Sequence, residues 1–403
     1  MRDPARQIVV TGAGVCCHLG DELAQISSWL REGRTLPFAT HAPAVEAGLR
    51  SRLAGAYRGE LEVDRQWARF MGRAAKMAYK AARAALAWSR LERRDIAVVA
   101  ASGTGDVATH IEVEQALGKP NGPRRVSPTV IPRMMSSTVS ANLAAALGVT
   151  GPSFSVSAAC AGGAYNILLA AELIEHGHVE AALAGGAEVI DLHFGAGFDA
   201  MRALNSQDNG RPERASRPYA ADRAGFIFGE GAGMVVLETR AHAEARGAAI
   251  LGSLRGYGMS SDGSGDMVFP TAEGALSAME RALRHAGAGA DQIDYVNTHG
   301  TSTPAGDLSE VRAMRRLFGR HLPYSSTKGY TGHTVSAAGA IEAVFTLLMM
   351  RGGFVAPSAN AEPLDPELAD YPPVLRPLSK TLDLSLSNSL GFGGTNVALV
   401  LGR

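Results

Sequence analysis

Four side chains in this sequence could carry out nucleophilic or acid–base chemistry: Cys160, His299, Lys328 and His333. Cys160 stands in SVSAACAGGAYN, between an apolar run and a segment with helical spacing, so we expect it at a strand-to-helix turn. His299 ends the strand-like stretch IDYVNTHG, and His333 opens a helix after the GYTG of SSTKGYTGHTVSAAG. A thiol with two imidazoles can form a covalent acyl-enzyme and stabilise an oxyanion, which is the chemistry of acyl transfer.

Each of these residues has a simpler interpretation when it is taken alone. A buried cysteine usually serves as a small apolar side chain, and a histidine at a strand end is more often a hydrogen-bonded structural residue than a base. An isolated lysine usually lies at the surface. The combination favours a functional site, because the glycines of CAGG and GYTGH let the backbone approach a substrate closely.

The positions of Cys160 and His333 in front of helices predict their protonation states. Unpaired N–H groups and the positive end of the helix dipole lie at such positions. We therefore expect the Cys160 thiolate to be favoured, with a pKa below its ordinary value of about 8.5. The same field disfavours an imidazolium, so His333 is expected to be neutral and able to donate a hydrogen bond to an oxyanion. This set suits thioester chemistry better than peptide hydrolysis.

The elements that must position these residues alternate between strands and helices. Helical spacing predicts helices over 69–91, 137–148, 163–176, 271–285 and 308–317. Apolar runs predict strands over 181–190, 231–238, 248–260 and 293–300, and the last segment predicts a hairpin with a glycine-rich tip. The prolines of 122–135 indicate a loop. The alternation predicts an α/β protein in which helices cover both faces of a mixed sheet.

Two halves, 1–247 and 248–403, each offer a strand, a reactive side chain at a turn and a helix. The first half carries Cys160 and the second carries both histidines. A formal net charge of zero gives no electrostatic case for nucleic acid or an anionic membrane as the main partner. The apolar runs are short for a membrane span, and MRDPARQIVV lacks the apolar core of a signal peptide. The three cysteines offer no disulfide framework, so we expect a soluble cytoplasmic protein.

The early stretch QIVVTGAG raises one alternative, a nicotinamide dinucleotide site in an oxidoreductase. Cys17 occupies the position of the third glycine in the G-x-G-x-x-G pattern, and no acidic residue follows at the proper distance. A tight turn beside a buried strand is the better interpretation.

Four blocks, SVSAACAGGA, THGTSTPAGDLSE, TKGYTGHTVSAAGAIE and NSLGFGGTN, resemble signatures of the elongating β-ketoacyl-acyl-carrier-protein synthases of the thiolase superfamily. The resemblance runs nearly end to end, and SSTVSANLA and GYGMSSDG look closer to the bacterial type I enzymes than to type II. It implies a duplicated thiolase fold with five αβαβα layers. It also implies decarboxylative Claisen condensation of a cysteine-bound acyl chain with malonyl-acyl-carrier protein. No metal or organic cofactor is expected, because loss of the substrate's carboxylate supplies the carbanion.

The resemblance assigns roles to the reactive residues. Cys160 would accept the acyl chain, while His299 and His333 would bind the malonyl thioester carbonyl, promote decarboxylation and stabilise the enolate. Lys328 would organise charge around the site with Glu310 as its ion-pair partner, in a structural or a catalytic role.

The resemblance also assigns substrate contacts. The backbone N–H groups of Cys160 and Phe392 would form the oxyanion hole. The Phe392 ring would gate the acyl pocket because glycines flank it, although simple packing at the hairpin tip is the alternative. Thr301 and Thr303 would hydrogen-bond the phosphopantetheine arm. Gly391 and Gly393 are expected to contact the substrate, and Met134, Met135 and residues 103–107 are expected to help shape the pocket.

The expected partner is an acidic acyl carrier protein, which a basic patch should attract. Arg65, Arg69, Arg124 and Arg125 match where the family places this patch, although solvated arginines are equally common. The resemblance implies a homodimer, or a heterodimer with a ketosynthase-like subunit. The alternative function is that of a chain-length-determining partner subunit of a type II polyketide synthase, but such subunits have lost the nucleophile. Fatty acid, polyene and polyketide pathways all remain open.

Overall fold

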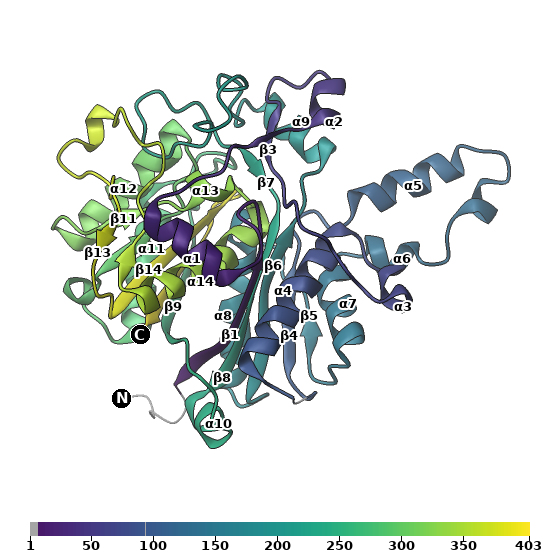
Figure 1. Cartoon of the computed structure of the whole chain (residues 1–403), viewed down its shortest axis with the longest axis horizontal. Coiled ribbons are helices and arrows are strands. Elements are labelled where there is room, and N and C mark those ends of the chain that lie inside the picture. Colours follow the sequence, from purple (N-terminus) through teal and green to yellow (C-terminus); the bar gives the residue numbers. More distant parts are fainter. Residues whose placement is uncertain (1–6, 93) are drawn as a thin grey trace.

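A ten-stranded sheet runs through the computed structural model, which describes residues 7–92 and 94–403 (Figure 1). The first six residues, part of the segment expected to lack a signal peptide, lie outside the described residues. The strand order is β11-β10-β14-β15-β9-β1-β8-β6-β4-β5. The strands of the first half are β1 (Ile8–Cys16), β4 (Ala97–Ala101), β5 (Ser153–Phe154), β6 (Ala181–Glu188) and β8 (Gly231–Thr239). Those of the second half are β9 (Gly252–Ser261), β10 (Tyr295–Asn297), β11 (Tyr324–Ser325), β14 (Leu384–Gly391) and β15 (Thr395–Gly402).

The two groups of strands meet along a short antiparallel ladder between β1 and β9, in which Ile8 lies opposite Leu254 and Val10 opposite Gly252. Within the groups, β4 runs parallel to β5 and β6, and β10 runs parallel to β11 and β14. The ladders β1–β8, β6–β8 and β14–β15 are antiparallel. The sheet is therefore mixed, as predicted, and the final hairpin is confirmed.

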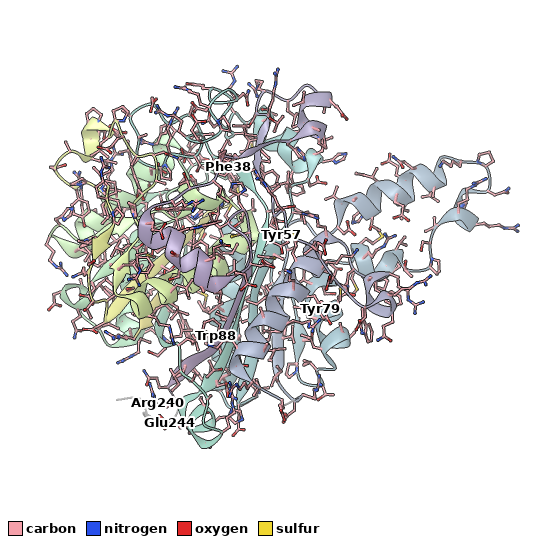
Figure 2. All side chains as sticks on the ribbon, in the orientation of Figure 1. Phe38, Tyr57, Tyr79, Trp88, Arg240 and Glu244 are labelled. Carbon is pink, nitrogen blue, oxygen red and sulfur yellow. The ribbon has the colours of Figure 1, made fainter. Side chains whose placement is uncertain are left out.

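Helices form three layers around the strands (Figure 1). The helices α4 (Arg73–Ser89) and α7 (Thr138–Leu147) cover the first half, and α11 (Ala272–Ala286) and α12 (Pro304–Phe318) cover the second. Between them lie α8 (Gly162–Glu175) and α14 (Ala338–Gly352), which contact strands of both halves. On α4, Tyr79 is buried whereas Trp88 is exposed (Figure 2). This arrangement gives the five alternating layers that the resemblance implied.

The central helix explains the longest apolar stretch of the chain. Within the described residues, the run Val335–Gly352 is long and apolar enough to cross a membrane, but 89% of it is buried inside the fold. The expectation that every apolar run is too short to span a membrane is therefore wrong for this run, which is long enough. A helix that is apolar all round is also what the core of a soluble protein requires, and this one packs between the two groups of strands.

Two segments differ from the predicted elements. The helix expected over 69–91 begins at Arg73, because Gly72 takes an extended N-cap conformation and a separate short helix, α3 (Arg65–Ala68), precedes it. The loop expected over 122–135 contains η2 (Gly122–Arg125) and α6 (Val130–Met134). Their prolines lie in the first turn of each helix. The N–H groups of a first turn have no acceptor within the helix, so the missing N–H of proline costs no helical hydrogen bond there.

Candidate active site

Cys160 lies in η3 (Ala159–Ala161), which leads directly into α8, so the predicted turn in front of a helix is present. Ala159 has a positive φ of 46°, an uncommon conformation for a non-glycine residue that marks a sharp turn directly before Cys160. The thiol is buried, with a residue exposure of 2%. The apolar side chains around it are Phe198, Leu204, Phe226, Phe228 and Val335, with Phe392 at the edge.

Burial decides the protonation state of this thiol. It raises the pKa of Cys160 to about 12, and the nearby Glu188 carboxylate acts in the same direction. The backbone N–H groups of Phe392 and Cys160 and the charge of Lys328 oppose the shift but do not offset it. The expectation of a lowered thiol pKa is therefore wrong. The helix N-terminus acts as expected, but its field is outweighed by desolvation among side chains brought in from distant segments.

The raised pKa predicts slow alkylation of Cys160 in the free protein. With a pKa of about 12, the thiolate fraction at pH 8 is about one in ten thousand. We expect the rate of Cys160 alkylation by iodoacetamide, followed by peptide mass spectrometry, to rise about tenfold per pH unit from pH 7 to 10. Peptide mapping separates this site from the buried Cys16 and Cys17. A rate that levels off below pH 9 would contradict the assigned shift.

The two histidines meet beside the thiol. His299 follows β10, and His333 is held by its backbone, which donates to the Ile227 carbonyl at 2.8 Å and accepts from Gly229 N–H at 2.9 Å. Their ring centroids are 5.2 Å apart in an edge-to-face arrangement. Burial first, and then the positive charge of Lys328, lowers the pKa of each imidazole well below its ordinary value. Both rings are therefore neutral near pH 7, which agrees with the expectation for His333.

Lys328 is the cation of this site, and it is buried rather than at the surface. Its ammonium lies 3.4 Å from His299 Nδ1. An ammonium can only donate, so Nδ1 accepts and the ring proton belongs on Nε2. The ion-pair partner of Lys328 is Glu342 on α14, whose pKa burial raises to about 7. The expected pairing with Glu310 is wrong.

Glu310 instead orders the loop that carries His299. Its carboxylate accepts hydrogen bonds from the backbone N–H of His299 at 2.8 Å and of Gly300 at 2.9 Å. The Asn388 side-chain amide donates a third at 3.0 Å. Glu310 thus fixes the backbone under the histidine from α12, while Lys328 acts on its ring.

One cavity of about 510 Å³ brings most of the expected site residues together. They are Cys160, His299, His333, Glu310, Thr301, Thr303, Gly391 and Phe392. The Thr301 and Thr303 hydroxyls are 2.9 Å apart, and Lys328 lies behind His299. Gly393 does not line the cavity; its φ of 80° shows that it serves the hairpin turn. Met134, Met135 and residues 103–107 do not line it either.

Phe392 stands at the tip between β14 and β15 and packs against the side chains around the thiol. Its ring stacks on Phe198 with centroids 5.8 Å apart and an interplanar angle of 23°. Phe198 belongs to α9 (Leu192–Ala200), so the contact joins segments far apart in sequence. The ring thus packs against the apolar side chains around Cys160 and also lines the cavity.

The four arginines expected to bind a carrier protein are all exposed. Arg65 begins α3, and Arg69 lies over the ring of Phe70 at 4.6 Å. Arg124 and Arg125 end η2, which follows α5 (Val107–Leu117), a helix that reaches away from the body of the molecule (Figure 1).

Sequence reasoning missed Glu342, Phe198 and Glu188. A signal existed for Glu342, the only charged residue of AAGAIEAVFTLLMM, because a buried charge needs a partner. Nothing in the sequence distinguishes Phe198 from other core aromatic residues. Glu188 ends the strand β6, where a polar residue is unremarkable.

Comparison with known proteins agrees with this geometry. Residues 5–243 match the family model "Beta-ketoacyl synthase, N-terminal domain", and residues 251–362 match "Beta-ketoacyl synthase, C-terminal domain". The chain is 39% identical over 407 residues to 3-oxoacyl-[acyl-carrier-protein] synthase 1 of Escherichia coli, covering 98% of each protein. The crystal structure of a β-ketoacyl synthase from Burkholderia phymatum is 34% identical with a TM-score of 0.93, covering 99% of each chain.

A more distant solved structure is a type II polyketide ketosynthase in complex with its acyl carrier protein. It is 26% identical with a TM-score of 0.89, and the match covers 99% of each chain. The matched models span most of the sequence, and the matched relatives span nearly all of it. The chain therefore belongs to the β-ketoacyl synthase family and adopts the thiolase fold.

Proposed function

We propose that this protein is a 3-oxoacyl-[acyl-carrier-protein] synthase, an acyltransferase that elongates an acyl chain by decarboxylative condensation. The observation that carries the proposal is one cavity with a buried thiol, Cys160, and two neutral imidazoles, His299 and His333. A thiol can hold the acyl group as a thioester, and neutral imidazoles can donate hydrogen bonds to an oxyanion without first losing a proton.

In the first step, the Cys160 sulfur attacks the thioester carbonyl of an acyl-carrier protein. A bond forms between Sγ and the carbonyl carbon, and the bond to the pantetheine sulfur breaks. The thiol proton leaves with the pantetheine sulfur, which departs as a free thiol. The N–H groups of Cys160 and Phe392, which both stabilise charge at Sγ, are positioned to stabilise the oxyanion of this step.

In the second step, malonyl-carrier protein loses carbon dioxide when the bond to its carboxylate breaks. The electron pair becomes an enolate, whose oxygen accepts hydrogen bonds from His299 and His333. The enolate carbon attacks the acyl-enzyme carbonyl, a carbon–carbon bond forms, and the Cys160 sulfur leaves and takes up a proton. The Lys328 contact at Nδ1 leaves the Nε2 proton of His299 available for donation.

The rival assignment, a non-catalytic chain-length subunit, fits poorly because it needs no nucleophile at this turn. We propose a homodimer, with a heterodimer of a ketosynthase and a related subunit as the alternative. Three buried free cysteines suit a reducing cytoplasm. We also infer that residues 1–247 and 248–403 are the two thiolase-like halves, since their strands form two contiguous groups in the sheet.

The proposed function predicts a covalent intermediate. Incubation with acyl-carrier-protein thioesters of graded length and unsaturation should add one acyl mass to Cys160, as measured by mass spectrometry of the intact chain and its peptides. The acyl group that loads fastest identifies the substrate class. An unmodified Cys160 with every acyl-carrier protein, in a protein that binds them, would refute the function.

Charge reversal on η2 tests the proposed carrier surface. We expect Arg124→Glu with Arg125→Glu to raise the KM for acyl-carrier protein by about tenfold or more, because an acidic partner loses attraction and meets repulsion. The rate with small acyl-pantetheine thioesters should be unchanged. Arg281→Glu with Arg284→Glu on the exposed side of α11 makes the same change of charge and is the matched control. Equal loss of both activities would contradict the assignment.

A further inference from the structure

Glu188 is a buried carboxylate that the proposed reaction does not use. It ends β6 and has an exposure of 0%. It accepts hydrogen bonds from the Ser102 hydroxyl at 2.9 Å, the Thr104 hydroxyl at 2.7 Å and the Gly103 N–H at 3.1 Å. Its own neighbour, Val189, donates a longer one at 3.4 Å. Three consecutive residues, 102–104, are therefore hydrogen-bonded to the Glu188 side chain.

Among the buried carboxylates, Glu188 is unusual because none of the described residues forms an ion pair with it. Within the described residues, each of the other buried carboxylates except Glu310 forms an ion pair with arginine or lysine; they are Asp199, Asp208, Glu230, Glu238, Asp307 and Glu342. Burying a charge without a counter-charge is unfavourable, so such a group is a candidate for a functional role. Glu310 has such a role, because it orders the loop that carries His299.

The segment that Glu188 holds, defined here as the Ser102 turn (residues 102–105), packs close to the helix that follows the nucleophile. A Cβ on Gly103 would lie 2.8 Å from Glu188 Oε2 and 3.4 Å from the Ser336 side chain. Ser336 in turn fills the space beside Gly162, the first residue of α8, where a Cβ would lie 2.5 Å from its hydroxyl. No spare volume separates the turn, Ser336 and the N-terminal end of α8.

The turn is also internally ordered. The Ser102 hydroxyl accepts hydrogen bonds from the N–H groups of Thr104 and Gly105 while it donates to Glu188. Gly105 takes a positive φ of 68°, which glycine tolerates without strain. The Ser102 and Thr104 hydroxyls and the Gly103 N–H face Glu188, so loss of the carboxylate would remove the three bonds that tie the turn to the end of β6.

We propose that Glu188 is a positioning residue for Cys160: it holds the Ser102 turn against the N-terminal end of α8 and presents a negative charge to the thiol. This inference rests on the proposed role of Cys160 as the acyl acceptor. Two effects follow: a fixed wall beside Cys160 for the acyl transfer step, and a small further rise of the thiol pKa beyond the rise that burial causes.

The charges around the thiol are consistent with this assignment. Lys328 lowers the pKa of Cys160 and Glu188 raises it, so the two charges act on the thiol in opposite directions. Among the other titratable groups that line the cavity, His299 and His333 are neutral, and Glu310, Arg202 and Arg223 lie there as well. Glu230, which directly precedes β8 in the chain, is paired with Arg73 at 2.6 Å.

The charge is tested by Glu188→Gln, which keeps the shape of the side chain. We expect the rate of Cys160 alkylation by iodoacetamide to increase about three- to tenfold between pH 7 and 9, because removal of a nearby negative charge lowers the thiol pKa. Acylation of Cys160 by acyl-carrier protein should slow about tenfold as the turn loosens. Decarboxylation of malonyl thioester, which the histidines carry out, should be unchanged.

A matched control is available in Glu238→Gln. Glu238 is also buried and hydrogen-bonded, to Thr11, His242 and Arg246, but it lies at the other end of the β6–β8 ladder, opposite Ala181. Seven residues of strand separate the two ends, about 23 Å. Figure 2 shows Arg240 and Glu244, on the α10 (Arg240–Ala245) helix that also carries His242, at this remote end. Loss of the Glu238 carboxylate should leave the pH profile of Cys160 alkylation unchanged.

A second variant distinguishes the positioning effect of Glu188 from the effect of its charge. It also tests the proposal if the Glu188→Gln variant does not fold. Thr104→Val removes one donor and keeps the carboxylate, so acylation should slow several-fold while alkylation is not accelerated. The proposal is overturned if Glu188→Gln alkylates like the unmodified chain, or if both variants lower acylation and decarboxylation equally. The alkylation comparison needs no carrier protein, so it stands even if the unmodified chain never forms an acyl-enzyme, which would refute the proposed function alone.

Discussion

Replacing Cys160 with alanine is expected to abolish condensation, lowering the rate of 3-oxoacyl product formation by at least about a thousandfold. Within the described residues, no other thiol lines the cavity, so no group can take over the acyl chain. The measurement is mass spectrometry of the carrier protein after incubation with acyl- and malonyl-carrier protein.

The same variant separates the two halves of the reaction. The histidines and Lys328 are untouched by Cys160→Ala, so carbon dioxide release from malonyl-carrier protein should continue. Removal of one buried sulfur should lower the free energy of unfolding by only about 1 kcal/mol, so the variant remains folded. Condensed product formed at a rate near that of the unmodified chain would refute the acyl-enzyme mechanism.

The second large effect is expected from Lys328→Met. This change leaves Glu342 buried without a cation, which should lower the free energy of unfolding by about 3–5 kcal/mol at pH 8. The contact at His299 Nδ1 is lost as well, so condensation should fall by about a hundredfold. Urea unfolding and the condensation assay measure the two effects.

The pH dependence of that destabilisation has a definite sign. Burial already raises the pKa of Glu342 to about 7, and loss of Lys328 raises it further. The unfolded carboxyl has an ordinary pKa of about 4.3, so between these values the folded state binds more protons than the unfolded state. Because the unmodified chain already takes up this proton near pH 7, stability of the variant relative to the unmodified chain should recover as the pH falls toward 7 and change little at lower pH. A deficit that is independent of pH would contradict this.

A double-mutant cycle distinguishes the two candidate partners of Lys328. Lys328→Met combined with Glu342→Gln should be less destabilised than the sum of the single changes by at least about 1 kcal/mol, because residues in contact are not additive. Lys328→Met combined with Glu310→Gln should be closer to additive, since Glu310 binds backbone N–H groups instead. The opposite result would support the pairing expected from sequence.

The local features of this site were predictable from sequence because they depend on neighbouring residues. Apolar spacing and glycines placed Cys160 at the start of a helix, and the alternation in the last segment predicted the hairpin that carries Phe392. The same local reasoning failed at the start of α4, where one glycine, Gly72, interrupts an otherwise continuous helical pattern. Boundaries depend on single cap residues, whereas the existence of an element depends on many.

The sequence by itself singled out Cys160, the two histidines that lie beside it, and the family to which the chain belongs. Only the tertiary structure decided the electrostatics: the partner of Lys328, the raised pKa of Cys160 and the position of Glu188. The reason is physical. A helix dipole acts on the residues next to it in the chain, but desolvation and ion pairing depend on which distant segments are brought into contact. Here Phe198, Phe226 and α14 come from far along the chain to remove water from the thiol and the lysine.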